Sequence, residues 1–339
     1  MESAVSVSRL PATLTLAMAL AASLAAPAGA GDARPAPARP EQLVIISFDG
    51  AHDNRLWERS LALGDRTGAR FTYFLSCTFL MTKAHSKAYQ APGKSAGRSN
   101  VGFAPDRADV AARLGHIWAA YQAGHEIGSH GCGHFDGKDW SKAQWQTEFA
   151  SFRAALGNAW ADHGLAAASP AGWADFADRA VRGFRAPYLS ADSGLYAALA
   201  ADGFAYDASG VSRGPAAPDT GGRVARFSLP LIPEGPAGRP VIGMDYNLFA
   251  RHSRAVETPD TSGDFEARAL AAFRNAFEKQ YQGTRIPLQL GFHFVEMNGG
   301  AYWRALERFA TETCGKPEVE CVSYQDAMKR LRSPDDSAS

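Results

Sequence analysis

Short apolar runs alternate with amphipathic segments along most of the chain. Leu43 to Phe48 is an uninterrupted apolar run, which is typical of a strand buried on both faces of a parallel sheet. Further strands are expected at 70–75, 125–129, 183–188, 204–207, 241–245, 286–294 and 319–323. Segments with helical spacing of apolar residues separate them, at 56–68, 106–123, 138–163, 194–201, 265–280, 302–313 and 324–331.

This repeated alternation of strand and helix predicts an α/β fold with a parallel sheet of about seven strands. Two stretches interrupt it. The segment 81–105 is polar and rich in Gly, Ser and Lys, and 211–238 is rich in Gly and Pro with a short apolar run at 227–232. Long loops in a compact domain are often functional, and these two are positioned to cover a site.

Polar residues stand at or just after the ends of the expected strands. In a parallel α/β barrel the carboxyl ends of the strands share one face, and that face carries the chemistry. The sequence therefore predicts that these side chains lie together at one end of a barrel: Asp49, His130, Arg185, Asp207, Asp245 and His293.

The stretch from Gly124 to His134 is the strongest local signal. It places His130 and His134 four residues apart among glycines. Neutral imidazole is a common zinc ligand, and one short segment can supply two ligands to one ion. The alternative is a Gly-rich turn with surface histidines, because the H-x-x-x-H spacing alone is a weak signal.

The first thirty residues have the pattern of a secretory signal peptide. Arg9 ends a short n-region, 14–26 is an apolar run rich in Ala and Leu, and Ala28-Gly29-Ala30 forms an A-x-A cleavage site. A Pro/Ala-rich linker is expected at 31–40 and the folded domain at 41–332. We expect a periplasmic or secreted protein with no membrane anchor after cleavage near Ala30; a retained N-terminal anchor is the alternative.

Charge and cysteine content narrow the classes of partner and compartment. The 339-residue chain has a formal net charge of zero, so no electrostatic footprint for nucleic acid or an anionic membrane is expected. The four cysteines suggest disulfides after export. Cys314 and Cys321 flank a turn and are expected to pair. Cys77 and Cys132 can pair if their strands are neighbours; otherwise Cys77 is a buried free thiol.

The order of short motifs resembles the polysaccharide deacetylase (NodB-homology) family of carbohydrate esterases. The resemblance runs from about Leu43 to Leu331. The motifs that carry it are Ser47-Phe48-Asp49, His130-Gly-Cys-Gly-His134, Arg185-Ala186-Pro187-Tyr188, Asp207 and His293. It implies a distorted (β/α) barrel in a single domain, with neighbouring second and third strands that allow a Cys77–Cys132 bridge.

The resemblance also implies a set of roles. His130 and His134 would bind a divalent metal, expected to be Zn²⁺, together with a carboxylate. Asp49 would be the general base and His293 the general acid. Arg185 would pair with Asp49, and Asp207 would orient His293. The substrate would lie against Tyr188, whose backbone N–H would serve the oxyanion site, and against Asp207 and Asp245, although Asp245 can equally be structural.

The sequence departs from the family where a second aspartate would follow Asp49. Gly50 stands there. Asp53 is the favoured replacement as metal ligand. The alternatives are His52, Asp49 itself, or a site that no longer binds metal tightly.

These features predict a metal-dependent hydrolase that removes N-acetyl or O-acetyl groups from an extracytoplasmic glycan. Two alternatives stay open: a hydrolase of a small amide or imide with the same fold, and a glycan-binding relative without activity.

Overall fold

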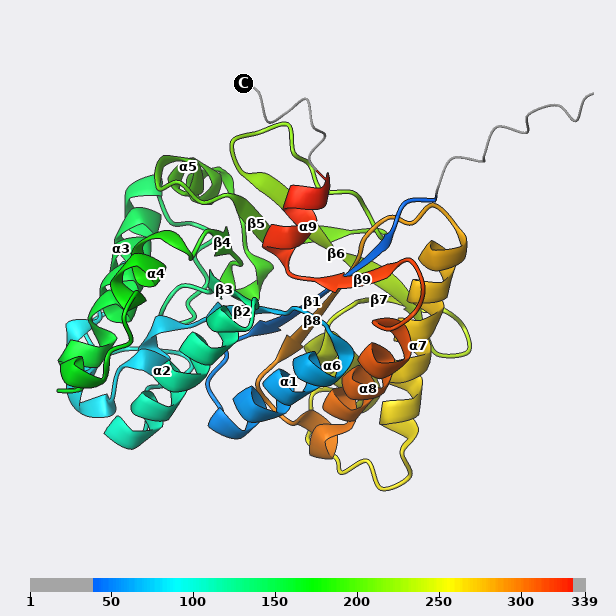
Figure 1. Ribbon diagram of the computed structural model, residues 1–339, viewed down its shortest axis with the longest axis horizontal. Coiled ribbons are helices and arrows are strands. Elements are labelled where there is room, and N and C mark those ends of the chain that lie inside the picture. The colour runs from blue at the N-terminus through cyan, green and yellow to red at the C-terminus, as the bar shows by residue number, and fades with distance from the viewer. Residues whose placement is uncertain (1–38, 332–339) are drawn as a thin grey trace, which may run out of the picture. The chain divides into compact units, whose positions relative to one another are not determined.

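A computed structural model describes residues 39–331 (Figure 1). The expected signal peptide at 1–30 and most of the linker at 31–40 lie outside these residues. The strands are β1 (Gln42–Asp49), β2 (Thr72–Leu75), β3 (Glu126–Ser129), β4 (Gly183–Phe184), β5 (Tyr206–Ser212), β6 (Ala225–Glu234), β7 (Arg239–Ile242), β8 (Leu288–His293) and β9 (Val319–Val322).

Helices follow or cover most of these strands. They are α1 (Asn54–Thr67), α2 (Arg107–Gln122), α3 (Lys142–Asp162), α4 (Trp173–Arg179), α5 (Ser193–Ala201), α6 (Asp245–Ser253), α7 (Asp264–Gln282), α8 (Met297–Thr313) and α9 (Tyr324–Leu331). None of the helices within 39–331 combines the length and apolar character needed to cross a bilayer.

The strands form one nine-stranded sheet in the order β7-β6-β5-β4-β3-β2-β1-β8, with β9 also paired to β1. Within the described chain every strand pairing is parallel except that of β6 with β7. The predicted distorted (β/α) barrel is therefore confirmed. One detail was wrong: the Gly/Pro-rich stretch contains β6, which pairs with β7 as an antiparallel hairpin, because Gly235 and Gly238 take up positive φ in the turn between them.

The barrel closes along a narrow seam between β6 and β8. Gly243, just after β7, donates from its N–H to the Pro230 carbonyl of β6 and accepts from the N–H of Gly291 in β8. A parallel bridge joins Met244 to Gly291. A Cβ on Gly291 would lie 2.6 Å from the terminal methyl group of Met244, so a larger residue here would have to displace that side chain. We call residues 243–244 the seam segment.

Strand β1 is the centre of the core, as its apolar sequence predicts. All eight of its residues are buried. The Phe48 ring stacks on Tyr73 of β2 at 5.3 Å and on Trp303 of α8 at 5.1 Å between centroids. This packing fixes the end of β1, and with it the next residue, Asp49.

Both expected disulfides are present, so Cys77 is not a free thiol. Cys77 and Cys132 form the site disulfide, and Cys314 and Cys321 form the C-terminal disulfide. The segment 81–105 is tied back on itself by a bridge between Thr82 and Ala104. It contains a 3-10 helix, Lys83–Ala88, and is otherwise the long loop that the sequence predicts.

Candidate active site

A buried ion pair lies at the carboxyl ends of β1 and β4. Arg185 donates from Nη1 to Asp49 Oδ1 at 2.8 Å, and the arginine is fully buried. Its other donors are used by the Ala208 carbonyl and the Tyr324 hydroxyl, which hold the guanidinium in place. Burial acts to raise the pKa of Asp49, but the charge and hydrogen bond of Arg185 and the nearby histidines together outweigh it and lower the pKa, so the carboxyl stays ionised.

The two histidines of the sequence motif lie together beside this pair. Their ring centroids are 5.0 Å apart. His130 Nδ1 lies 2.8 Å from the carbonyl oxygen of Arg185, so Nδ1–H donates there and Nε2 is left as a ligand atom. Burial lowers the pKa of His130 to about 3 and also lowers that of His134. Both imidazoles are therefore neutral, the form that binds metal ions.

His293, at the end of β8, is oriented by Asp245. The ring Nδ1 lies 2.6 Å from Asp245 Oδ1, and the backbone N–H of His293 donates to Oδ2 at 2.8 Å. Burial acts to lower the pKa of His293, but the carboxylates of Asp245 and Asp49 outweigh it and raise the pKa. His293 is thus suited to carry a proton at neutral pH.

The expectation that Asp207 orients His293 was wrong. The buried Asp207 carboxyl accepts from the Ser209 hydroxyl at 2.6 Å and from the Ser209 N–H at 3.2 Å. The Ser209 hydroxyl oxygen in turn accepts from the N–H of Ala186 at 2.8 Å. Asp207 therefore stabilises the chain next to Arg185, and it does not line the cavity described below.

These groups surround one cavity of about 490 Å³. Asp49, both motif histidines and His293 line it, with Tyr188, Leu189, Met244 and Tyr246 forming apolar walls. Tyr188 and Tyr246 are 58% and 50% exposed at the rim. A smaller branch of about 230 Å³ reaches His52 and Phe79.

Asp53 does not lie in this cavity, so the favoured replacement for the missing aspartate is not supported by the geometry. Asp53 is the N-cap of α1, where Oδ1 accepts from the N–H groups of Arg55 and Leu56. Oδ2 pairs with the Arg55 guanidinium at 3.0 Å. An aspartate in the N-cap position accepts hydrogen bonds from the first N–H groups of the helix, and these bonds turn the Asp53 carboxylate away from the cavity.

His52 is the remaining alternative within the loop. Its ring lines the branch of the cavity, stacks on Phe79 at 4.7 Å and bonds through Nδ1 to the Gly50 carbonyl oxygen at 2.9 Å. Arg113 holds the His52 carbonyl, which fixes the loop. Within 39–331, no group of three His, Cys, Asp or Glu side chains is arranged as a complete metal site. Two imidazoles and the Asp49 carboxylate, which face the same cavity, nevertheless fit the donor types of a divalent ion.

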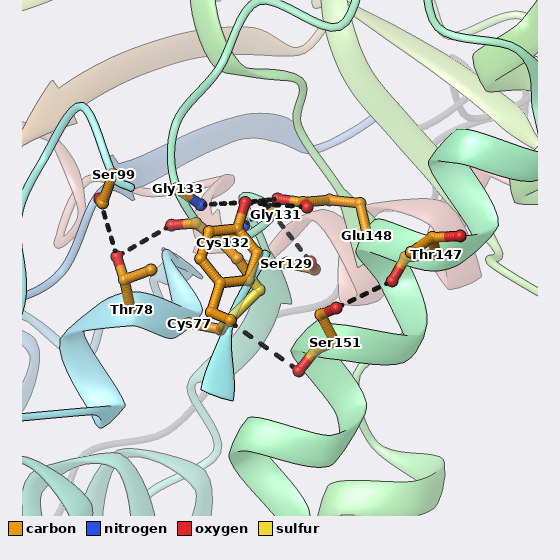
Figure 2. The surroundings of a disulfide bond; sticks show 11 residues. Cys77, Thr78, Ser99, Ser129, Gly131, Cys132, Gly133, Thr147, Glu148 and Ser151 are labelled. Carbon is orange, nitrogen blue, oxygen red and sulfur yellow. Dashed lines mark hydrogen bonds between the residues drawn. A yellow bond between two sulfur atoms is a disulfide. The ribbon is translucent and has the colours of Figure 1, made fainter. Parts of the chain in front are cut away.

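The turn between the two motif histidines is braced by residues that sequence reasoning missed (Figure 2). Glu148 of α3 accepts from the Cys132 N–H at 2.7 Å and from the Tyr89 hydroxyl. The Tyr89 hydroxyl oxygen accepts from the Gly133 N–H at 3.0 Å. The only signal in the sequence was a glutamate inside the apolar stripe of α3, next to Phe149.

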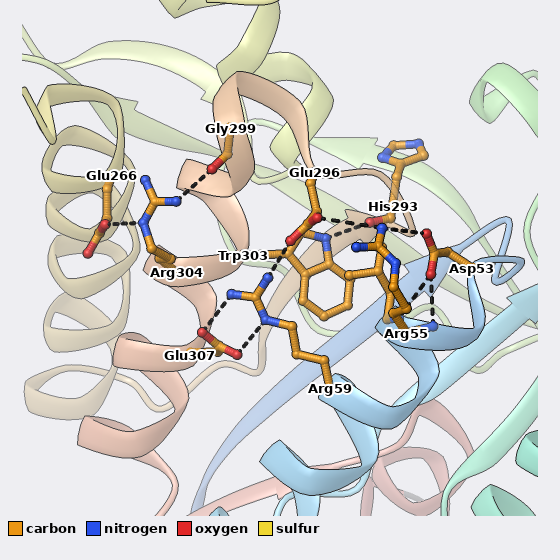
Figure 3. Close-up of polar contacts among 11 residues, drawn as sticks. Asp53, Arg55, Arg59, Glu266, His293, Glu296, Gly299, Trp303, Arg304 and Glu307 are labelled. Carbon is orange, nitrogen blue, oxygen red and sulfur yellow. Dashed lines mark hydrogen bonds and ion pairs between the residues drawn. The ribbon is translucent and has the colours of Figure 1, made fainter. Parts of the chain in front are cut away.

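An ion-pair network near His293 joins α1 to α8 (Figure 3). Arg59 pairs with Glu296 at 2.7 Å and with Glu307 at 2.7 Å. The indole N–H of Trp303 donates to the carbonyl of His293 at 3.0 Å. Glu296 is therefore part of the support of the His293 strand end.

No family model and no curated protein matches the sequence. Solved structures do. A putative polysaccharide deacetylase from Mycobacterium smegmatis aligns with a TM-score of 0.54 and 18% identity, over 88% of this chain and 94% of that one. An allantoinase aligns with a TM-score of 0.51 and 15% identity, over 85% of this chain and 90% of that one. The fold implied by the sequence motifs, that of the polysaccharide deacetylases, is therefore confirmed for this chain.

Proposed function

We propose that this protein is a hydrolase that removes N-acetyl groups from a glycan outside the cytoplasm. The observation that carries the proposal is the arrangement around one cavity: Asp49, which is held by Arg185, and His293, which is held by Asp245, both line it. One pair holds an ionised carboxylate and the other an imidazole whose pKa is raised, which suit the base and the acid of amide hydrolysis.

In this mechanism the substrate acetamide lies between Asp49 and His293. Asp49 keeps one oxygen on Arg185 and uses the other to accept a proton from the attacking water. His293 donates a proton from Nε2 to the leaving amine nitrogen while Nδ1–H stays on Asp245. The rim tyrosines, Tyr188 and Tyr246, offer aromatic faces to the sugar ring.

His130 and His134 would hold a divalent metal ion, with Zn²⁺ as the expected ion and Asp49 or His52 as the third protein ligand. Such an ion, when bound, polarises the acetamide carbonyl and lowers the pKa of water. Export is supported by the signal-like pattern at 1–30 and by two disulfides, which persist in oxidising compartments.

The test is metal analysis of purified protein combined with acetate release from chitotetraose. We expect His130→Ala and His134→Ala each to lose both metal and activity. Asp49→Asn should keep metal and lose turnover if Asp49 is only the base; loss of metal would make Asp49 a ligand. Retention of stoichiometric metal in either histidine variant would refute the site. The exposed His85→Ala, which lies outside the cavity, is the matched control.

A second candidate is hydrolysis of a small amide or imide. It is favoured by the fold similarity to an allantoinase and by Gly50, which contributes no carboxylate beside Asp49. Stoichiometric metal or hydrolysis of a cyclic amide, combined with no acetate release from any glycan, would select this candidate. A protein with neither metal nor hydrolysis would instead be a glycan-binding relative.

A further inference from the structure

A second cavity, of about 400 Å³, adjoins the catalytic cavity. It is lined by Lys94, Arg98, Asn100, Phe135, Asp136 and Tyr188. Tyr188 lines both cavities. The Asn100 side-chain N–H₂ lies 3.4 Å from the Tyr188 hydroxyl and donates to the His134 carbonyl at 3.0 Å. A ligand that extends past Tyr188 from the catalytic cavity therefore enters this second cavity.

The second cavity has an excess of positive charge. Lys94 and Arg98 come from the long loop 81–105, and both are exposed. Lys94 Nζ lies 5.5 Å from the centroid of the Phe135 ring. Within residues 39–331 neither cation forms an ion pair with a carboxylate, whereas Arg55 and Arg59 of α1 are both paired.

We propose that this cavity binds the carboxylate of an acidic sugar next to the sugar whose acetamide is hydrolysed. The inference rests on the proposed function and narrows its substrate class to an anionic N-acetylated glycan. Two cations and the Asp136 carboxylate leave one net positive charge on the lining, which matches a singly charged carboxylate better than a doubly charged phosphate. Phe135 gives the sugar ring an apolar surface, and Arg98 can bind a carboxylate with two parallel N–H groups.

The experiment compares two tetrasaccharides that carry the same acetamide. Chitotetraose is neutral, and a hyaluronan tetrasaccharide alternates N-acetylglucosamine with glucuronate. Acetate release by the full chain is measured with each, for the wild type and for Lys94→Ala/Arg98→Ala. A charge-matched control, Arg66→Ala/Lys279→Ala, removes two exposed cations at the ends of α1 and α7, outside both cavities.

We expect the cavity variant to raise KM for the hyaluronan tetrasaccharide about tenfold, with kcat and the chitotetraose KM unchanged, because exposed ion pairs of this kind are individually weak. The wild-type KM for the anionic substrate should also rise with added NaCl. An equal effect on both substrates, or no effect on the anionic one, overturns the inference.

The failure of the proposed function is distinguishable from the failure of this inference. If the wild type releases acetate from neither glycan, the proposed hydrolysis is refuted. Calorimetric binding of the hyaluronan tetrasaccharide then tests the anionic subsite by itself. Binding that weakens about tenfold in the cavity variant but not in the control supports the anionic subsite. Binding that is equal in both variants, or absent in the wild type, refutes it.

Discussion

Glu148 offers the most direct test of how the chain holds its two motif histidines. Its side chain is 2% exposed and belongs to α3, yet it binds the turn between His130 and His134 through the Cys132 N–H and the Tyr89 hydroxyl. Glu148→Ala leaves both donors without their acceptor in a buried place. Two lost hydrogen bonds and a buried, unpaired N–H together cost about 3 kcal/mol.

The variant should also bind metal less tightly. Residues that position metal ligands typically cost about 10–100-fold in metal affinity when they are removed, and we expect a loss in that range. Urea denaturation measures the first effect, and calorimetric titration of the metal-free protein with Zn²⁺ measures the second. Both are needed, because a purely structural role would lower stability without changing the affinity of the folded protein.

Glu148→Gln separates the two roles further. Oε1 of Glu148 lies 2.7 Å from the Cys132 nitrogen and 3.0 Å from the Tyr89 hydroxyl, so a single amide oxygen can accept both bonds. We expect Gln to recover most of the metal affinity. Glu278→Ala, an exposed glutamate of α7, is the control. If Glu148→Ala binds Zn²⁺ as tightly as the wild type, the brace does not position the histidines.

Three further predictions concern the charged pairs and the disulfides. Asp245→Asn removes the carboxylate that raises the pKa of His293, so the decline of kcat with rising pH should begin at lower pH; an unchanged pH profile contradicts the role of Asp245. Arg185→Met should cost about 3–5 kcal/mol at pH 7, because it leaves the Asp49 charge buried and unpaired. Asp49 has a lowered pKa in the wild type, so it stabilises the fold above its unfolded pKa, and this stabilisation is lost as pH falls through the folded pKa. In the variant, acid instead neutralises the unpaired buried carboxylate. Urea denaturation should therefore show a smaller loss of stability from Arg185→Met at pH 4 than at pH 7. Replacing both cysteines of the site disulfide by alanine should cost about 4 kcal/mol of unfolding free energy, against about 2 for the C-terminal disulfide, since their sequence separations are 55 and 7; equal losses would show that loop entropy is not the cause.

The sequence was sufficient for the fold because the strands of the barrel are continuous apolar runs. The run at 43–48 could form little else than a buried parallel strand, and polar residues at strand ends then fell on one face. β6 was harder to recognise. Six of its ten residues are buried, but it contains two prolines and lies in a stretch rich in Gly and Pro, so the short apolar run at 227–232 was its only mark in the sequence.

Site residues were predictable where they stand at the end of a strand. They were less predictable where contacts across the barrel determine the direction of the side chain. Asp49, His130 and His293 line the cavity as expected. Asp53 was predicted as a metal ligand, but it bonds to the N–H groups at the start of α1 instead. Asp207 was predicted to orient His293, but it bonds to Ser209 instead. The partnership of Asp245 with His293 spans 48 residues and depends on the closure of the sheet, which no local pattern encodes.

That closure has a dynamic consequence. The seam segment joins β8 through one bridge, whereas β1 and β8 are paired along Val44 to Asp49. Local opening is cheapest where the fewest hydrogen bonds must break, so the amides of Gly243 and Gly291 should exchange with solvent before those of β1. Asp245 directly follows the seam segment, and each such opening would release His293 from its carboxylate. Moderate heating should therefore abolish catalytic activity while the core of the protein is still folded.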